Sequence, residues 1–247
     1  MDLHSHLDLY PDAMGILAEV NRRNSFTLVV TTSPRAWVGT SKVFSGHRNI
    51  HVALGLHPEI VDRKASEKSL LLSLVEHAPF IGEIGLDGSP RFRKTLLLQE
   101  EIFAAVVARC EQVGGKIMSI HSRGAVGRVL DILERHPLAG QAVLHWFSGT
   151  EKQLLRAISL GCWFSVGPAM LQGLKGQELF QGMPMDRVLP ETDGPFAQVA
   201  GRSLQPWDAV SIANYVSRIW HMRPEQVLIQ WNHNLSRLLQ MNSNHRF

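Results

Sequence analysis

The chain has 247 residues, 45% of them hydrophobic, and a formal net charge of +3 with an isoelectric point near 9.1. This length and composition are sufficient for one large folded unit with a full core. Its two cysteines, Cys110 and Cys162, form no CxxC pair, which disfavours a disulfide framework or a zinc–thiolate site and fits a reducing cytoplasm. No apolar run approaches the roughly 18 residues that span a bilayer, and the polar amino terminus is unlike a signal peptide. We therefore expect a cytoplasmic protein without membrane association.

Short apolar, β-branched runs alternate with helix-like segments along the chain. Besides an opening strand, the predicted strands are residues 26–32, 50–54, 80–84, 116–120, 142–144, 162–166 and 187–189. The predicted helices include residues 11–24, 66–77, 96–113 and 124–136, with 207–220 and 224–240 closing the chain. Ser66 and Thr150 are expected to be helix N-caps, because each precedes a periodic apolar pattern.

This alternation of strands and helices determines the predicted fold class. It implies parallel strands joined by right-handed crossovers. Eight such strands match a closed (β/α)8 TIM-type barrel, for which about 250 residues is typical. No internal repeat, low-complexity tract or linker interrupts the sequence. We therefore expect an α/β protein with a single barrel domain over residues 1–247.

The opening strand combines acids and histidines: Asp2, His4, His6 and Asp8 all lie within eight residues. Successive side chains of a strand point to opposite faces, so His4 and His6 point the same way. Two converging imidazoles can hold one metal ion. By itself such a pair is more often two ordinary strand histidines than a metal site, so the interpretation depends on further ligands.

Four more ionisable residues each come after an apolar run: Glu83 within the predicted strand 80–84, and His121, His145 and Asp193 after later strands. Active sites of (β/α)8 barrels lie at the carboxyl ends of the strands, so these residues are expected to meet the two histidines of the opening strand at one mouth. Unpaired charge at the end of a buried strand costs several kcal/mol unless something compensates it, and a cation does so. Four histidines and two carboxylates therefore predict a metal site.

Five motifs occur in a fixed order along the chain. They are Asp2-x-His4-x-His6-Leu7-Asp8, Gly82-Glu83-Ile84-Gly85-Leu86-Asp87, Ile120-His121-Ser122-Arg123, His145-Trp146-Phe147-Ser148-Gly149 and Glu191-Thr192-Asp193-Gly194-Pro195. Together they resemble the TatD-type metal-dependent deoxyribonuclease family of the amidohydrolase-like superfamily, and the resemblance covers essentially the whole chain. It implies hydrolysis of phosphodiester bonds in DNA, often in the 3′ to 5′ direction, with one or two divalent cations.

The resemblance also implies a role for each matching residue. His4, His6 and Asp193 would hold a first metal, and Glu83 would bridge to a second metal held by His121 and His145. Glu83 and Asp193 are the expected catalytic residues, with Asp193 also accepting a proton from the attacking water. A mixed set of imidazoles and carboxylates suits zinc or manganese at least as well as magnesium.

Four neighbouring residues are candidates for supporting or substrate-binding roles. Asp87 and Glu191 are placed to hydrogen-bond a ligand imidazole and fix its tautomer. Arg123 either pairs with a phosphate or forms an ordinary salt bridge with Glu191 or a helix carbonyl. His57 either contacts substrate or is a simple loop histidine.

The segment after Asp87 departs from the family pattern, because residues 88–94 form a short, basic loop. Its charges either contact backbone phosphates, with Phe92 offering a face to a base, or are solvated at the start of a helix. Trp146 and Phe196 similarly either stack on an unpaired terminal base or pack at the barrel rim.

Three classes of function remain after these observations. The first is a nuclease that acts on single-stranded or frayed DNA ends, because a barrel mouth admits a strand end more easily than a duplex. The second is a metal-dependent hydrolase of a small phosphate monoester or amide. Lys116 begins its strand, so no lysine stands where a carbamylated bridge would be, which disfavours the amide version. The third is a subunit in which the metal is structural, for example in a bacterial phage-defence assembly with partner proteins.

Overall fold

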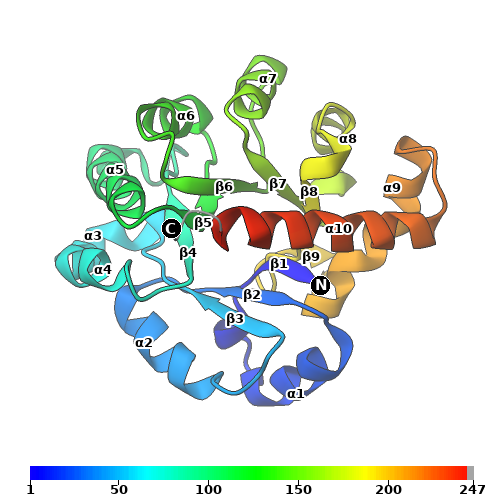
Figure 1. Cartoon of the computed structure of the whole chain (residues 1–247), viewed down its shortest axis with the longest axis horizontal. Coiled ribbons are helices and arrows are strands. Elements are labelled where there is room, and N and C mark those ends of the chain that lie inside the picture. The colour runs from blue at the N-terminus through cyan, green and yellow to red at the C-terminus, as the bar shows by residue number, and fades with distance from the viewer. Residues whose placement is uncertain (244–247) are drawn as a thin grey trace.

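The computed structural model describes residues 1–243, and within them eight parallel strands form a barrel surrounded by helices (Figure 1). The strands are β1 (Asp2–Ser5), β2 (Thr27–Val30), β3 (Ile50–Ala53), β4 (Phe80–Gly85), β5 (Lys116–His121), β6 (Gly140–His145), β7 (Trp163–Val166) and β8 (Val188–Pro190). Every predicted strand is present. Most of their residues are buried, as expected for parallel strands covered on both faces.

Consecutive strands pair in parallel within two groups, β1–β2–β3 and β4–β5–β6–β7–β8. Between β3 and β4, Leu54 forms a parallel bridge with Ile81. At the other seam, the Asp193 amide donates to the His4 carbonyl over 2.8 Å. Asp2 reinforces this seam, because its carboxylate lies 3.0 Å from the amide nitrogen and 2.6 Å from the hydroxyl of Thr192. These contacts close the predicted TIM-type barrel.

Helices surround the strands in Figure 1. They are α1 (Ala13–Arg23), α2 (Pro34–Val43), α3 (Val61–Lys64), α4 (Lys68–Leu74), α5 (Leu96–Gln112), α6 (Val126–Arg135), α7 (Glu151–Ser159), α8 (Leu174–Gln181), α9 (Ala213–Ile219) and α10 (Pro224–Ser243). A short antiparallel pair, β9 (Gln198–Val199) and β10 (Arg202–Ser203), follows β8. The predicted closing helix at 207–220 is divided into a 3-10 helix, Pro206–Ile212, and α9.

The two N-cap predictions have different outcomes. Thr150 caps α7 in a capping box, with its hydroxyl accepting the Gln153 amide proton and the Gln153 side chain accepting the Thr150 amide proton. The prediction for Ser66 is wrong, because Ser66 lies inside a 3-10 helix, Ala65–Glu67, and α4 starts at Lys68. The Lys68 amide donates to the Ala65 carbonyl, so the preceding turn satisfies a backbone group that a side-chain cap would otherwise bind.

Helix α10 covers the amino end of the barrel and crosses its centre in Figure 1. Its Trp231 is fully buried. Its Asn234 amide donates to the carbonyls of Met185 and Val188, both over 2.8 Å, just before and at the start of β8. The barrel is therefore closed at this end, which leaves the carboxyl ends of the strands as its mouth.

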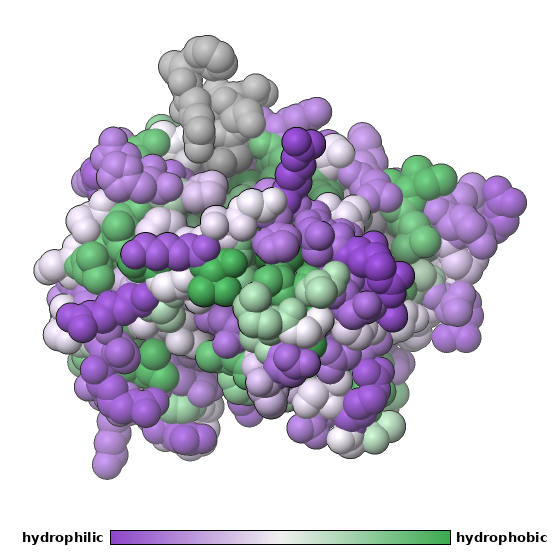
Figure 2. All heavy atoms as spheres, turned by 90° about the horizontal axis from the view of Figure 1, so that it is seen from below, coloured by the Kyte–Doolittle hydropathy of each residue, from purple (hydrophilic) through white to green (hydrophobic). Residues whose placement is uncertain are grey.

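The outer surface is mixed in character. Figure 2 shows the face that lies lowest in Figure 1, over α1 and α2, where hydrophobic residues form small groups between hydrophilic ones. Within residues 1–243, no helix is both long enough and apolar enough to cross a membrane.

Candidate metal centre

Glu83 of β4 lies at the centre of the predicted ligands, with a side chain that is 1% exposed. Its Oε2 is 3.4 Å from His4 Nε2 and 3.1 Å from His6 Nε2, both delivered by β1 and the residue following it. Its Oε1 is 2.9 Å from His121 Nδ1 at the end of β5 and 3.3 Å from His145 Nε2 at the end of β6. The two carboxylate oxygens therefore face two different pairs of imidazoles, which is the arrangement a bridging carboxylate requires.

Asp193, after β8, completes the group around Oε2. Its Oδ1 lies 3.8 Å from His4 Nε2 and 3.7 Å from His6 Nε2. Its backbone has a φ of 56°, in the left-handed region that aspartate tolerates better than most residues. The hydrogen bond from its amide to β1 holds this conformation, so barrel closure itself positions the carboxylate.

The spacing of these atoms fits a metal ion. Ligand atoms about 2.1 Å from a zinc ion lie roughly 3.0–3.5 Å from one another. The imidazole nitrogens of His4 and His6 lie 3.1–3.8 Å from the nearest oxygens of Glu83 and Asp193. His4 Nε2 and Glu83 Oε2 are buried and have no hydrogen-bond partner among the described residues. Such atoms cost about 1–3 kcal/mol each when left unsatisfied, and a cation would satisfy both.

Carboxylates outside the cluster set the tautomers of two imidazoles. Asp87 Oδ2 is 2.9 Å from His121 Nε2, and Glu191 Oε1 is 3.4 Å from His145 Nδ1. An ionised carboxylate only accepts hydrogen bonds, so the proton of each neutral ring lies on the nitrogen that faces it. The opposite nitrogen then presents its lone pair toward Glu83, as a metal ligand must. Asp87 and Glu191 thus each contact one of the two imidazoles at the ends of β5 and β6.

His57 is more central than its sequence position indicated. Its Nε2 lies 3.0 Å from Glu83 Oε2, and it lines the same cavity, so it is not a simple loop histidine. Its Nδ1 accepts the backbone N–H of Glu59 over 3.1 Å. Because that lone pair is occupied, the proton of the neutral ring lies at Nε2, on the side that faces Glu83. His57 therefore presents a proton to the cluster, whereas His121 and His145 present lone pairs.

Opposite charges determine the protonation of the cluster. Burial raises the pKa of Glu83, but the charges of His57 and His4 and hydrogen bonds from the other imidazoles lower it more, leaving it well below its usual range. Burial lowers the pKa of His121, but hydrogen bonds to Asp87 and Glu83 outweigh this effect and raise it to about 9. A cation that binds here therefore takes the place of protons on the imidazoles.

Residues that orient the cluster were missing from the sequence prediction. Ser119 of β5 lies with its hydroxyl 2.8 Å from His4 Nδ1, and Ser165 of β7 hydrogen-bonds Glu191. Both serines are the single hydroxyl side chain within an apolar strand. Because a buried polar group needs a partner, that pattern was a signal that could have identified them.

The cluster opens into a cavity of 590 Å³ at the barrel mouth. Trp146 and Phe196 line it; Phe196 is 61% exposed, and its ring meets the His6 ring edge-on at 5.1 Å. Arg123 also lines the cavity with an exposed side chain. It forms no salt bridge with Glu191, whose carboxylate is bound by His145, the Trp146 amide and Ser165. The salt-bridge alternative for Arg123 is therefore wrong with respect to Glu191.

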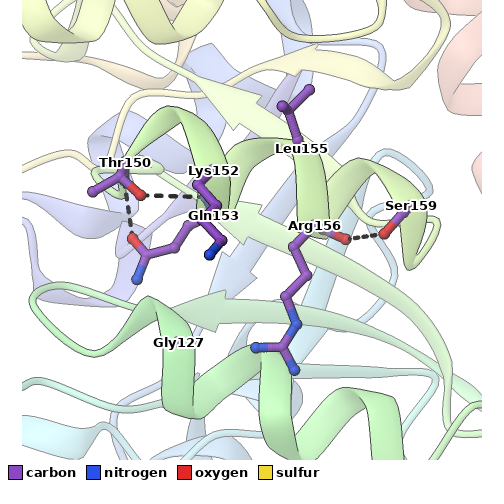
Figure 3. A pocket seen from close by; sticks show the side chains of 7 residues that line it. All are labelled: Gly127, Thr150, Lys152, Gln153, Leu155, Arg156 and Ser159. Carbon is purple, nitrogen blue, oxygen red and sulfur yellow. Dashed lines mark hydrogen bonds between the residues drawn. The ribbon is translucent and has the colours of Figure 1, made fainter.

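A second cavity, of 650 Å³, lies outside the barrel between α6 and α7 (Figure 3). Its lining includes Lys152 and Arg156 but neither a histidine nor a carboxylate. Arg156 is paired with Asp131 and Glu134. Metal-binding chemistry is therefore found at the barrel mouth and not in this outer cavity.

A (β/α)8 barrel with histidines and carboxylates gathered at the carboxyl ends of its strands defines the class of metal-dependent hydrolases. Within that class, the model of the TatD related DNase family matches residues 1–240. The chain belongs to this family, as its motifs indicated.

Individual relatives agree with this assignment. Human Deoxyribonuclease TATDN3 is 27% identical over 252 residues, covering 92% of this chain and 90% of the relative. A protein from Edwardsiella piscicida named 3′-5′ ssDNA/RNA exonuclease TatD is 32% identical over 160 residues, covering 62% of this chain and 60% of the relative. The crystal structure of YjjV, a TatD homologue from Escherichia coli, superposes with a TM-score of 0.84 at 22% identity, covers 96% of both chains and confirms the barrel fold. The chain is thus a metal-dependent hydrolase of a deoxyribonuclease family.

Proposed function

We propose that the chain removes nucleotides from the 3′ end of single-stranded DNA by metal-dependent hydrolysis. The observation that carries the proposal is the orientation of Glu83, whose two oxygens each face a separate pair of histidines within 3.4 Å. This arrangement provides two adjacent cation positions, and paired cations are suited to displacement at phosphorus.

The proposed ligands follow from the geometry. His4, His6 and Asp193 surround the Oε2 side of Glu83, and His121 and His145 surround its Oε1 side. One or two zinc, manganese or magnesium ions are the candidate occupants. A divalent cation in this cluster supplies Lewis acidity toward a phosphoryl oxygen and makes a water molecule acidic enough to attack at neutral pH.

Side chains at the mouth are placed to accept a proton and to bind the substrate. The Asp193 side chain is 17% exposed and lines the cavity, so its carboxylate is placed to take a proton from an attacking water. Nε2 of His57 lies 3.0 Å from Glu83, and the imidazoles around that carboxyl hold its pKa well below its usual range despite its burial, so it stays ionised. Arg123 at the rim is free of Glu191 and is available to pair with a substrate phosphate.

The shape of the mouth supports a strand end as substrate. Its 590 Å³ volume lies within the roughly 300–1,000 Å³ of small-ligand sites, enough for a terminal nucleotide and too small for a duplex. Trp146 and Phe196 line the cavity and offer rings to an unpaired base. The name of the Edwardsiella piscicida relative supports the direction of digestion and the single-stranded substrate.

One observation disfavours an amide hydrolase that depends on a carbamylated lysine. Lys116 lies at the start of β5, and its Nζ donates to the carbonyls of Glu76 and Ala78 over 3.1 and 2.8 Å. It therefore lies at the amino end of the barrel, away from the cluster. Glu83 is the bridging group that the described residues offer.

The test is an assay of metal-loaded protein on end-labelled single-stranded DNA, duplex DNA, RNA and a phosphomonoester, beside the Glu83→Gln variant. We expect laddering of single-stranded DNA from the 3′ end, absent in the variant. Turnover of the phosphomonoester alone would replace this proposal with a phosphatase function. The absence of any turnover with metal bound would favour a structural metal in a larger assembly.

A further inference from the structure

A groove opens from the barrel mouth, separate from the outer cavity between α6 and α7. It has a volume of 440 Å³ and shares Glu59 and Ile60 with the mouth cavity, so the two spaces meet at these residues. Asp62 and Arg63 of α3 form one wall of the groove. The opposite wall comes from the segment between β4 and α5, which contains residues 88–94. The groove therefore begins beside the metal cluster and leads toward the outer surface.

The wall between β4 and α5 is basic and carries an aromatic ring. Arg91 and Lys94 are exposed, line the groove and form no ion pair with any described residue. The Arg91 guanidinium lies 5.1 Å from the centre of the Phe92 ring. Arg63 on the other wall is 3.7 Å from Asp62, which partly neutralises it. Two free cations beside an aromatic face are the elements with which proteins hold single-stranded nucleic acids.

Hydrogen bonds fix this wall in position. The Gly88 amide donates to the Arg123 carbonyl over 2.8 Å, and the Ser89 amide donates to Asp87 Oδ1 over 2.8 Å. Gln99 of α5 donates to the Phe92 carbonyl over 3.3 Å. The loop is thus tied both to the strand ends of the cluster and to the helix that follows, so its charges are held beside the mouth.

We propose that the groove holds the nucleotides adjacent to the one being cleaved, so that a single strand runs from the cluster past Glu59 into the space beside Arg91 and Lys94. This path rests on the proposed nuclease function. The Glu59 carboxylate lies within 4.8 Å of His121 and Asp87 atoms and repels phosphate at the junction. Phosphates of the strand therefore lie on either side of it, one beside Arg123 and the next beside Arg91 and Lys94, and a sugar or base edge faces Glu59. Phe92 stacks on a base.

Binding tests this path without requiring cleavage. Fluorescence anisotropy is measured with a labelled oligo-deoxythymidylate of about ten nucleotides on the Glu83→Gln protein over a series of salt concentrations. Adding Arg91→Ala and Lys94→Ala should reduce the slope of log affinity against log salt by about 0.7, because the two cations neutralise one phosphate and each neutralised phosphate on a single strand contributes about 0.7. Adding Phe92→Ala instead should weaken binding at every salt concentration by about tenfold.

A matched control removes the same number of charges elsewhere. Lys42 and Lys152 are exposed and line neither the mouth nor the groove, so Lys42→Ala with Lys152→Ala should leave the slope unchanged. Equal slopes for the groove variant and the control would overturn the proposed path, even if the wild type digests DNA. Groove-dependent binding in a protein that cleaves no phosphodiester would instead remove the nuclease function and retain the groove as a nucleic-acid site.

Discussion

The two ends of the barrel are built from opposite kinds of residue. At the amino end, α10 covers the strands with the buried Trp231 and satisfies backbone carbonyls through Asn234. At the carboxyl end, the buried groups are imidazoles and carboxylates, and His4 Nε2 and Glu83 Oε2 lack hydrogen-bond partners among the described residues. The indole nitrogen of Trp231 also lacks a partner among the described residues, so the two ends differ in the kind of atom left unpaired. At the carboxyl end the unpaired atoms belong to ionisable groups that can bind a cation, as expected for a fold in which chemistry is carried by strand ends.

The sharpest test of this division is Glu83→Gln. An amide keeps the volume of the side chain but has only one oxygen, so it no longer presents a negative oxygen to each histidine pair. We expect hydrolysis to fall by at least about 10³-fold, in the range of lost transition-state charge stabilisation. Steady-state kinetics measures the loss, and circular dichroism should show an unchanged fold.

Glu225→Gln in the exposed first turn of α10 is the matched control and should retain full activity. Asp193→Asn should behave like Glu83→Gln. Substantial residual cleavage by either variant at the mouth would show that the cluster is not the catalytic centre.

Trp231→Ala should lower stability and leave catalysis intact, the reverse of what is expected for Glu83→Gln. Removing a fully buried indole at the amino end leaves a cavity and should lower the free energy of unfolding by about 3–5 kcal/mol. Because the cluster lies at the other end, kcat per folded molecule should be unchanged. Urea denaturation and active-site titration measure the two quantities, with Trp231→Phe as a milder comparison. A lost kcat in the folded fraction would mean that the two ends are coupled.

Glu191→Gln tests a positioning residue of the mouth. The amide can still accept from the Trp146 amide, but it no longer forces the His145 proton onto Nδ1. We expect metal affinity to fall about 10- to 100-fold. Raising the metal concentration should then restore kcat, and this recovery separates an effect on metal binding from a general loss of structure. If the variant shows the same metal dependence as the wild type, Glu191 does not position His145 for metal binding.

Asn234→Ala should have the smallest effect. It removes two hydrogen bonds to the backbone near the start of β8 and should cost about 1–2 kcal/mol of stability. Activity at low temperature should match that of the wild type. Thermal unfolding followed by circular dichroism checks the prediction, and a large activity loss with normal stability would contradict it.

The barrel and the cluster were predictable because each depends on a short local pattern. Apolar runs identify the strands, and an ionisable residue that ends such a run, such as His121 or His145, is placed at the mouth by topology alone. The proton position on His57 was not predictable, because it depends on the Glu59 amide in the folded loop. Ser66 was assigned as a cap because sequence does not reveal that the preceding turn is already helical.

The groove between α3 and residues 88–94 was likewise not predictable from a local sequence pattern. The basic character of residues 88–94 was visible in the sequence, but its facing wall on α3 is some 30 positions earlier and is brought opposite only by the barrel. The sequence therefore favoured phosphate contact over simple solvation of this loop only slightly. Tertiary structure supplied the junction at Glu59 and Ile60 that joins the loop to the mouth.

The most direct measurement is anomalous diffraction from crystals soaked in manganese. The account predicts one or two anomalous peaks bonded to Glu83, one on the side of His4, His6 and Asp193 and the other on the side of His121 and His145. Loss of these peaks in Glu83→Gln crystals would support the bridging role. Absence of any peak at Glu83 in the wild type, or a peak confined to Glu59, Asp87 and His121, would contradict it.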